Sequence, residues 1–319
     1  RGGSGEGGQQ SVGINLDSQN LSGQIISQSA SIDLQGIGGN GTGLNNDGID
    51  IKGYTLNAAN NLTIEARAGL GLDRFGLFTK DAILRAGETF QISGYSSQGS
   101  IESNDFGIYS VDTDFISEGG STTQQNIIQG EVALNNNLPF SSLSTGTWIE
   151  GRERRSTIKT ASDLLIEGTT GEAFFSIGTA LWSVDITTGR GSPHSTRPAS
   201  LRINGMGGST LDTFIWPDPG ILGDSLLTTY GLSIDDTTIN TSGPASLSGR
   251  LEQSGGAIPV GVFASSALFV SSNSSITSAQ DILISGDAGS REVGESGIVT
   301  GVYIESSEIR TLPQSTNTP

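Results

Sequence analysis

Two pairs of closely spaced aspartates are the residues most able to do chemistry. Asp112 and Asp114 lie in VDTDF, and Asp235 and Asp236 lie in SIDDTT. Clustered carboxylates, often beside arginine or lysine, can cleave a glycosidic bond. Alternate residues of a strand share a face and adjacent residues do not, so the first pair could face one groove, whereas only one member of the second could. Asp112 and Asp114 therefore predict a polysaccharide lyase or glycoside hydrolase as an alternative function.

The single histidine limits other reaction classes. His194 lies in GRGSPHSTRP, and the chain has no cysteine. Zinc sites rich in histidine are excluded, and His194 has no second histidine or cysteine to work with. We interpret His194 as an exposed loop residue, and we expect no catalytic, cofactor-binding or metal-binding residue in this chain.

Oxygen-bearing side chains alternate with glycines in GGNGTGLNNDGID, from Gly38 to Asp50. Carboxylate, amide and carbonyl oxygens are the usual ligands of Ca²⁺. The segment lacks the nonapeptide of calcium-binding β-rolls and the spacing of an EF-hand loop. A structural calcium ion stays open as an alternative, and no other cofactor is expected.

The charge of the chain restricts its partners. It carries 33 acidic and 16 basic residues, for a net charge of -17. Nucleic acid or an anionic membrane surface would meet a repulsive field. Arg152, Arg154 and Arg155, in GRERRS, form the basic cluster, and such a cluster is typical of a solvated loop or strand edge. The stretch from Ala257 to Val270 is interrupted by Pro259 and is too short to span a membrane.

A repeat must position these side chains. The chain has 319 residues, 34% of them apolar, and 47 glycines, a composition that favours short strands and turns over helices. A glycine recurs with an apolar residue eight positions later. The anchor glycines are Gly13, Gly48, Gly76, Gly107, Gly178, Gly231, Gly261 and Gly301. The paired apolar residues are Leu21, Leu56, Leu84, Phe115, Ile186, Ile239, Phe269 and Ile309.

A second half-motif, apolar-x-apolar and then usually glycine, follows most units. It begins at Ile32, Leu62, Phe90, Leu164, Leu201 and Ile282. The segment around Trp148 and Ile158 is a further, imperfect unit. Two to three short strands per unit indicate one coil of a parallel β-helix, and about nine coils at ~4.8 Å each predict a core ~40 Å long.

The repeat also predicts how the coils are held together. Each coil should bury one line of aliphatic side chains against its neighbours, and glycines should serve the bends by positive φ or close backbone approach. Phe75, Phe106 and Tyr230 precede anchor glycines, and we expect them to stack in or beside the core as packing residues. A ligand platform is the less favoured interpretation.

Three stretches carry a family resemblance: SASIDLQGIGGNGTGLNNDGIDI (Ser29 to Ile51), SDLLIEGTTG (Ser162 to Gly171) and SAQDILISGDAG (Ser278 to Gly289). From about Gly13 to Thr311 the chain resembles the repeat region of filamentous-haemagglutinin-like and autotransporter adhesins. The resemblance implies a right-handed parallel β-helix, of eight to nine coils, that is secreted to the cell surface of a diderm bacterium. Neither the family's secretion domain nor an outer-membrane barrel is recognisable, so autotransporter and two-partner secretion both stay open.

We therefore expect one β-helix domain over residues 13–311, between a Gly/Ser-rich linker (1–12) and a Pro/Thr-rich tail (312–319), as a segment cut from a longer secreted protein. The leading hypothesis is a non-catalytic adhesin stalk or scaffold in attachment, aggregation or biofilm formation. Its expected partners are glycans or proteins on host or neighbouring cells. The absence of cysteine fits passage through an oxidising compartment.

Overall fold

The chain forms three parallel β-sheets that wind into a solenoid. The computed structural model describes residues 11–18, 23–40, 44–97, 103–119, 124–133, 141–171, 173–189, 198–208, 228–251, 263–288 and 297–312. All of the regular secondary structure in those residues is β-strand. Within them, accordingly, no helix has the length and apolar character needed to cross a membrane.

The strands belong to three sheets, which we name A, B and C after their order within each coil. Sheet A contains β1 (Ile14–Asp17), β4 (Ile49–Lys52), β7 (Arg74–Lys80), β10 (Asn104–Val111), β13 (Ser141–Glu150), β16 (Ala173–Trp182), β19 (Thr228–Asp235), β22 (Phe263–Ser271) and β25 (Gly297–Ile304). Sheet B contains β2 (Gly23–Ser27), β5 (Tyr54–Ala58), β8 (Ile83–Ala86), β11 (Asp114–Ser117), β14 (Ser156–Thr160), β17 (Val184–Thr188), β20 (Thr238–Thr241), β23 (Ser275–Ser278) and β26 (Glu308–Thr311). Sheet C contains β3 (Ile32–Ile37), β6 (Leu62–Arg67), β9 (Phe90–Ser97), β12 (Asn126–Ala133), β15 (Leu164–Thr170), β18 (Leu201–Gly207), β21 (Ala245–Leu251) and β24 (Ile282–Asp287).

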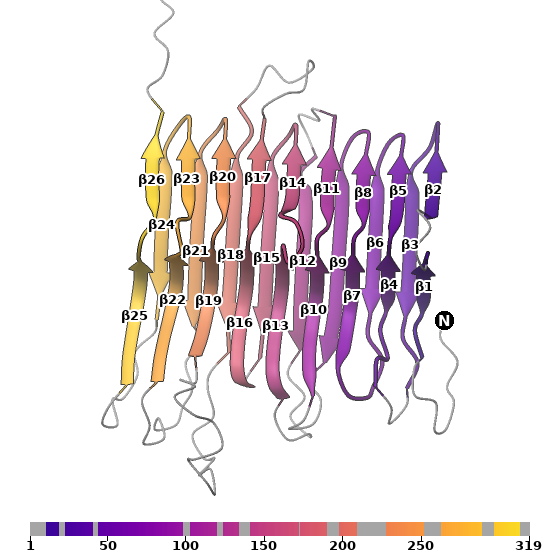
Figure 1. The fold of residues 1–319 in the computed structure, drawn as a ribbon, viewed down its shortest axis with the longest axis horizontal. Helices are drawn as coiled ribbons and strands as arrows, with labels where there is room; N and C mark the ends of the chain where they lie inside the picture. The colour runs from indigo at the N-terminus through magenta and orange to yellow at the C-terminus, as the bar shows by residue number, and fades with distance from the viewer. Residues whose placement is uncertain are drawn as a thin grey trace, which may run out of the picture.

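Each strand pairs in parallel with the strand three elements later, so one strand of each sheet makes one coil. In the described residues sheets A and B each hold nine strands and sheet C holds eight, which gives eight complete coils and a ninth with its strands of sheets A and B. In Figure 1 the chain rises along β1 and β2 at the front, descends along β3 behind them, and advances from indigo to yellow. That sense of winding is right-handed, so the predicted right-handed parallel β-helix is confirmed.

The core consists of vertical columns of apolar side chains. Along sheet B one column contains Ile25, Leu56, Leu84, Phe115, Ile158, Ile186, Ile239, Ile276 and Ile309. Its seven interior members, from Leu56 to Ile276, are fully buried. Each of these side chains packs against the equivalent side chains of the preceding and following coils, so the predicted nearest-neighbour stacking is confirmed.

Three assignments in the predicted register were wrong. The structure places Ile25 where Leu21 was expected, and Ile276 where Phe269 was expected. Ala267, not Gly261, lies beside Gly231, because Leu232 pairs with Leu268. Leu21 and Gly261 lie outside the described residues. In these two coils more than eight residues separate the anchor position in sheet A from the inward residue of sheet B. A fixed spacing of eight residues therefore does not identify that inward residue.

The imperfect unit is a complete coil. Thr147 and Trp148 pair with Ile108 and Tyr109, so Gly146 takes the anchor position, and Ile158 enters the column of sheet B. Two further half-motifs in sheet C, Asn126-Ile-Ile128 and Ala245-Ser-Leu247, have the same register. Nine coils therefore stack without interruption.

The anchor glycines lie where the backbones of sheets A and C approach each other closely. A Cβ atom added to Gly107 would lie 2.3 Å from the amide nitrogen of Glu131 and 2.6 Å from the carbonyl oxygen of Gly146. A Cβ on Gly130 of sheet C would lie 2.0 Å from that same oxygen. Since these contacts are with backbone atoms, sheets A and C approach each other too closely here for any side chain.

Positive φ occurs elsewhere, and mostly without glycine. Among the described residues, those that turn the chain from sheet A to sheet B with positive φ are Gly53, Asp81, Asp112, Ser183, Asp236, Ser272, Asn273 and Ser306. Asp and Ser tolerate this conformation better than bulky side chains because they hydrogen-bond locally. The expectation that glycines supply positive φ at the bends holds at this corner only for Gly53 among the described residues, and polar side chains take the other positions.

Candidate functional site: the outer face of sheet A

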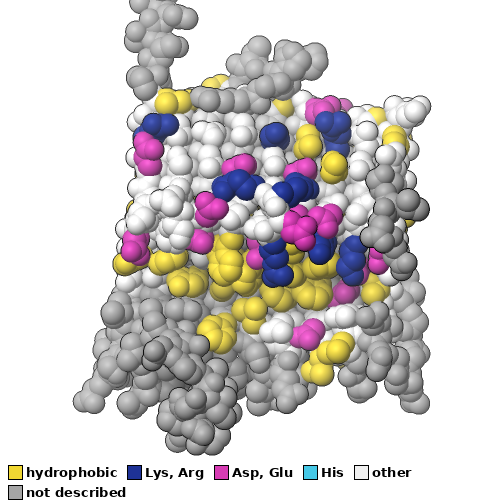
Figure 2. Space-filling model, viewed as in Figure 1, with side chains coloured by type: hydrophobic (Ala, Val, Ile, Leu, Met, Phe, Trp, Pro, Cys, Tyr) yellow, Lys and Arg dark blue, Asp and Glu magenta, His cyan; other side chains and the backbone are white. Residues whose placement is uncertain are grey.

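Nine aromatic side chains follow the outer face of sheet A along the solenoid. This aromatic stripe consists of Phe75, Phe78, Phe106, Tyr109, Trp148, Trp182, Tyr230, Phe269 and Tyr303. Phe78, Tyr109 and Trp148 share one column of paired strands. Figure 2 shows the stripe as part of a hydrophobic band across this face. The rings come from three outward columns of sheet A and together build an apolar surface along it.

The rings of the stripe contact one another. The centroid of Phe106 lies 4.8 Å from that of Tyr109 with the planes 23° apart, and Trp148 meets Trp182 at 4.4 Å and 65°. Phe75 and Phe106 stack at 5.2 Å, and Tyr230 lies 5.1 Å from Phe269. The expected stacking of Phe75, Phe106 and Tyr230 is confirmed, on the outside of the sheet and beside the core.

A groove interrupts the stripe near the middle of the rod. Its volume is about 530 Å³, and its walls come from four successive strands of sheet A, β10, β13, β16 and β19. Trp148, Trp182 and Tyr230 supply rings, and Ile177 and Phe175 add apolar surface. Four coils span three steps of ~4.8 Å, so the groove extends ~14 Å along the axis.

Charged side chains border the stripe on the side toward sheet B, as Figure 2 shows. They form pairs of opposite sign: Lys52 Nζ lies 2.6 Å from Asp50 Oδ2, Arg154 Nη1 lies 2.9 Å from Asp114 Oδ1, and Arg155 bonds two aspartates. We call this the charged border. Because its charges are largely compensated in pairs, it offers hydrogen-bonding groups without a strong field of one sign.

Tyr109 joins the stripe to the charged border. Its hydroxyl donates to Glu150 Oε1 at 2.6 Å, and Arg152 bonds both Glu150 and the Tyr109 oxygen. Burial, together with the adjacent Glu150 carboxylate, raises the pKa of Tyr109 above its usual range. The phenol therefore stays protonated, and its function at this place is to hold Glu150 and to present one face of its ring.

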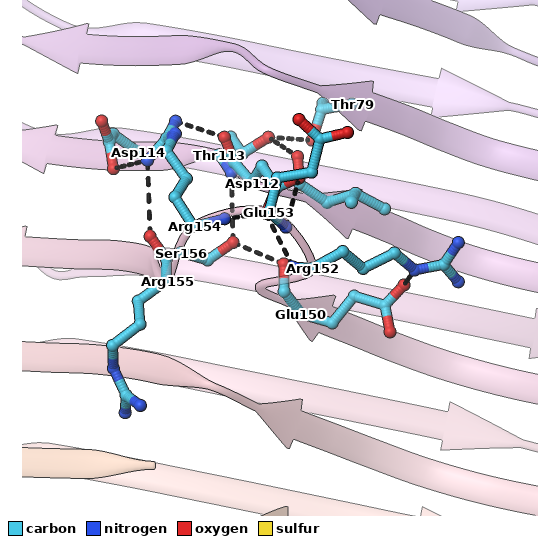
Figure 3. A network of polar contacts seen from close by, with 11 residues as sticks. Thr79, Asp112, Thr113, Asp114, Glu150, Arg152, Glu153, Arg154, Arg155 and Ser156 are labelled. Carbon is cyan, nitrogen blue, oxygen red and sulfur yellow. Dashed lines mark hydrogen bonds and ion pairs between the residues drawn. The ribbon is translucent and has the colours of Figure 1, made fainter. Parts of the chain in front are cut away.

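The corner residue Asp112 anchors the arginine-rich loop. Its Oδ1 accepts hydrogen bonds from the backbone amides of Arg152 at 2.7 Å, Glu153 at 3.2 Å and Arg154 at 3.2 Å, as Figure 3 shows. Asp112 is 1% exposed. A carboxylate that caps three amides in this way is held by its charge and geometry, and it is not free to act on a substrate.

The predicted carboxylate pairs do not line a common groove. Asp112 has positive φ and lies between β10 and β11, so strand alternation does not place it beside Asp114. Asp235 accepts a hydrogen bond from Ser271 Oγ at 2.6 Å, and Asp236 bonds Arg155 Nη1 at 2.9 Å. All four carboxylates are thus engaged by neighbouring coils.

The arginine cluster is a loop, as the sequence predicted. Arg154 and Arg155 are about four-tenths exposed, and both form ion pairs across coils. Arg155 Nε lies 2.9 Å from Asp185 and its Nη1 lies 2.9 Å from Asp236. Its guanidinium therefore ties three coils together. His194 lies outside the described residues.

The segment considered for calcium lines a second cavity, at the N-terminal end of the same face. The cavity has a volume of about 330 Å³ and is lined in part by Asp17, Asp47, Asp50 and Lys52. Burial raises the pKa of Asp47 to about 7, and burial also raises the pKa of Asp50. Asp47 Oδ1 accepts from the Phe75 amide at 3.0 Å. Among the described residues no group of three acidic, histidine or cysteine side chains is placed to hold a metal ion.

The comparisons with known proteins give no relative. No family model, no curated protein and no solved structure matches this chain.

The stripe has a signal in the sequence, although stacking was predicted only for Phe75, Phe106 and Tyr230 and no stripe was predicted. Phe78, Tyr109, Trp148 and Tyr303 each lie two residues after a glycine of the anchor column, and Phe269 lies two after Ala267. Residues two apart share a face of a strand, and the intervening residue, apolar except at Thr147, points to the other face. Trp182 gave no such signal, because its contact with Trp148 depends on how β13 and β16 are paired.

Proposed function

We propose that this chain is a non-catalytic repeat segment of a secreted bacterial surface adhesin, acting as a stalk or adhesive scaffold in attachment, aggregation or biofilm formation. The observation that carries the proposal is the aromatic stripe along an unbroken stack of nine coils. Apart from the buried Phe106, the rings of the stripe are partly or fully exposed, and a contiguous exposed apolar surface marks an interaction site. A solenoid adds length without changing its cross-section, which suits a stalk.

The proposal also rests on the resemblance of the repeats to filamentous-haemagglutinin-like and autotransporter adhesins. It implies secretion to the surface of a diderm bacterium and partners on a host or neighbouring cell. Surface proteolysis of producing cells, with this chain followed by antibody, tests the location. Digestion only after the cells are broken open would contradict it.

A polysaccharide lyase or hydrolase using Asp112 and Asp114 has less support, because Asp112 caps loop amides and Asp114 pairs with Arg154. The test measures the release of reducing ends or unsaturated sugars from a panel of polysaccharides. It compares the natural chain with the Asp112→Asn and Asp114→Asn variants. Activity that both substitutions abolish, in folded protein, would favour the enzyme.

Adhesion is tested with fluorescent microspheres that carry the chain, applied to cell monolayers and bacterial films. Attachment should exceed that of bare microspheres. A chain with Trp182→Ser and Phe269→Ser should attach less, whereas Tyr95→Ser, which changes an aromatic residue of β9 in sheet C, should attach as the natural chain does. If the natural chain attaches no better than bare microspheres, the adhesive part of the proposal is wrong.

A further inference from the structure

The groove in the stripe has the length and lining of a site for an extended polymer. Its aromatic walls come from three successive strands, β13, β16 and β19, which lie ~4.8 Å apart along the axis. The rings are not in one column: Trp182 pairs with Glu150, two residues after Trp148, and Tyr230 pairs with Ile177, five residues before Trp182. Because the rings are spread diagonally over the groove, a ligand that contacts all three must extend over several sugar units.

The lining suits the faces of sugar rings. The apolar face of a β-linked pyranose, where axial C–H groups converge, packs against an aromatic ring much as two rings pack together. Trp148, Trp182 and Tyr230 present such rings, and the Trp148–Trp182 pair is already fixed at 4.4 Å. Rings held by their neighbours lose little freedom on binding, which favours affinity.

The charged border suits the edges of the same sugars. Hydroxyl groups both donate and accept hydrogen bonds, so they match alternating carboxylates and guanidinium groups. Beside the groove residue Trp148, Arg152 is 63% exposed and can donate to a sugar hydroxyl, whereas Glu150 is 7% exposed and holds Arg152 and Tyr109 in place. Because the border is nearly compensated and the chain carries a net charge of -17, a polyanion or an anionic lipid surface is disfavoured.

We propose that the groove of Trp148, Trp182 and Tyr230 binds a neutral, extended β-1,4-linked glycan, with its sugars stacked on rings from three successive coils. This inference rests on the proposed adhesive function and names its ligand class. A helical α-linked glucan cannot follow the straight face of sheet A. A second copy of this chain is the competing occupant, and the experiments below separate the two.

Binding is tested by calorimetry and tryptophan emission with cellohexaose and chitohexaose, and with maltohexaose as the α-linked control. The chain has three tryptophans, so a Trp216→Phe background leaves the two that line the groove. We expect at least one β-linked hexasaccharide to bind and to shift the emission, and maltohexaose to do neither. Absence of binding by both β-linked sugars would overturn the inference.

Two substitutions locate the site. Trp182→Ala and Tyr230→Ala should each weaken binding roughly tenfold or more, as expected for the central ring of an interface. Tyr230→Phe should retain most of the affinity, because the ring face remains. Tyr95→Ala, on sheet C, is the matched control and should bind as the natural chain does. Equal affinity in Tyr95→Ala and in folded Trp182→Ala and Tyr230→Ala would place the sugar elsewhere and overturn the inference.

The remaining outcomes are also decisive. Self-association that Trp182→Ala abolishes, without binding of either β-linked sugar, would make the groove a contact between copies and overturn the inference. Attachment of microspheres without sugar binding would overturn the glycan and leave the adhesive proposal standing. Sugar binding without attachment to cells would support the groove while contradicting the adhesive function.

Discussion

Arg74 and Asp105 form a fully buried ion pair between neighbouring coils. Arg74 Nη2 lies 2.9 Å from Asp105 Oδ1, Arg74 Nε donates to the same oxygen at 3.0 Å, and the two side chains are 1% and 0% exposed. Ser103 Oγ donates to the other carboxylate oxygen at 3.1 Å. The pair joins β7 to β10 just below the aromatic stripe, at paired positions of the two strands.

Removing one partner of this pair should be costly. Arg74→Met leaves the Asp105 charge buried without its cation, and we expect a loss of about 3–5 kcal/mol in the free energy of unfolding. The double variant Arg74→Met/Asp105→Leu removes both charges and should recover most of that loss. Urea denaturation of the two variants measures the difference. A double variant no more stable than Arg74→Met would show that the pair is not the cause.

The glycine column should tolerate no methyl group in the interior. Gly107→Ala places a Cβ atom 2.3 Å from a backbone nitrogen, which no rotamer change relieves, so we expect a loss of about 1–3 kcal/mol or more. Gly301→Ala changes the same column in the last coil, where the nearest atom would be 3.0 Å away. Thermal unfolding should therefore show a clearly larger fall in Tm for Gly107→Ala. Similar Tm values in the two variants would contradict the close approach of sheets A and C.

The anchoring of the arginine loop by Asp112 can be separated from its backbone conformation. Asp112→Gly keeps the positive φ but removes the acceptor of three amide hydrogen bonds, so we expect a loss of about 1.5–3 kcal/mol. Asp81→Gly makes the same change at the same corner one coil earlier, where the side chain is exposed, and should alter stability by less than about 0.5 kcal/mol.

Trypsin provides a local measurement of the same loop. Arg152, Arg154 and Arg155 are potential cleavage sites, and cleavage requires the loop to leave the corner. Asp112→Gly should be cut there faster than the natural chain, and Asp81→Gly should not. If the loop of Asp112→Gly resists trypsin as the natural chain does, other contacts hold it.

Asp47 should make the chain less stable as the pH rises. Burial raises its pKa from 3.8 to about 7 in the folded state. Between those values the folded chain binds more protons than the unfolded chain, so the free energy of unfolding falls with increasing pH. Asp47→Asn keeps an oxygen for the Phe75 amide and cannot ionise. It should match the natural chain near pH 4 and exceed it at pH 8, by about 4 kcal/mol at most.

The control for Asp47 is Asp33→Asn, at an exposed position of β3. It lowers the negative charge of the chain equally but removes no buried group, and the slope of stability against pH should stay nearly as in the natural chain. Parallel slopes for Asp47→Asn and the natural chain, measured by urea denaturation across pH 4 to 8, would contradict the raised pKa.

Local spacing was enough to predict the coil, because it decides which side chains point inward. Residues two apart share a face, so Leu62 and Ile64, or Leu201 and Ile203, identify buried strand faces without knowledge of any partner. The parallel β-helix, its number of coils and most of its core columns follow from that rule. Register failed where a connection changed length, as at Ile25 and Ile276, because pairing between coils follows backbone hydrogen bonds and not a count from the last glycine.

The sequence by itself determined the strands of each coil and the apolar side chains that they bury, since both depend on residues a few positions apart in the chain. The tertiary structure alone decided the rest. Asp112 meets the loop amides about 40 residues later, and Trp148 meets Trp182, because stacking brings distant segments within ~4.8 Å of each other along the axis. Contacts of that kind depend on the summed lengths of every intervening loop, which no local pattern encodes.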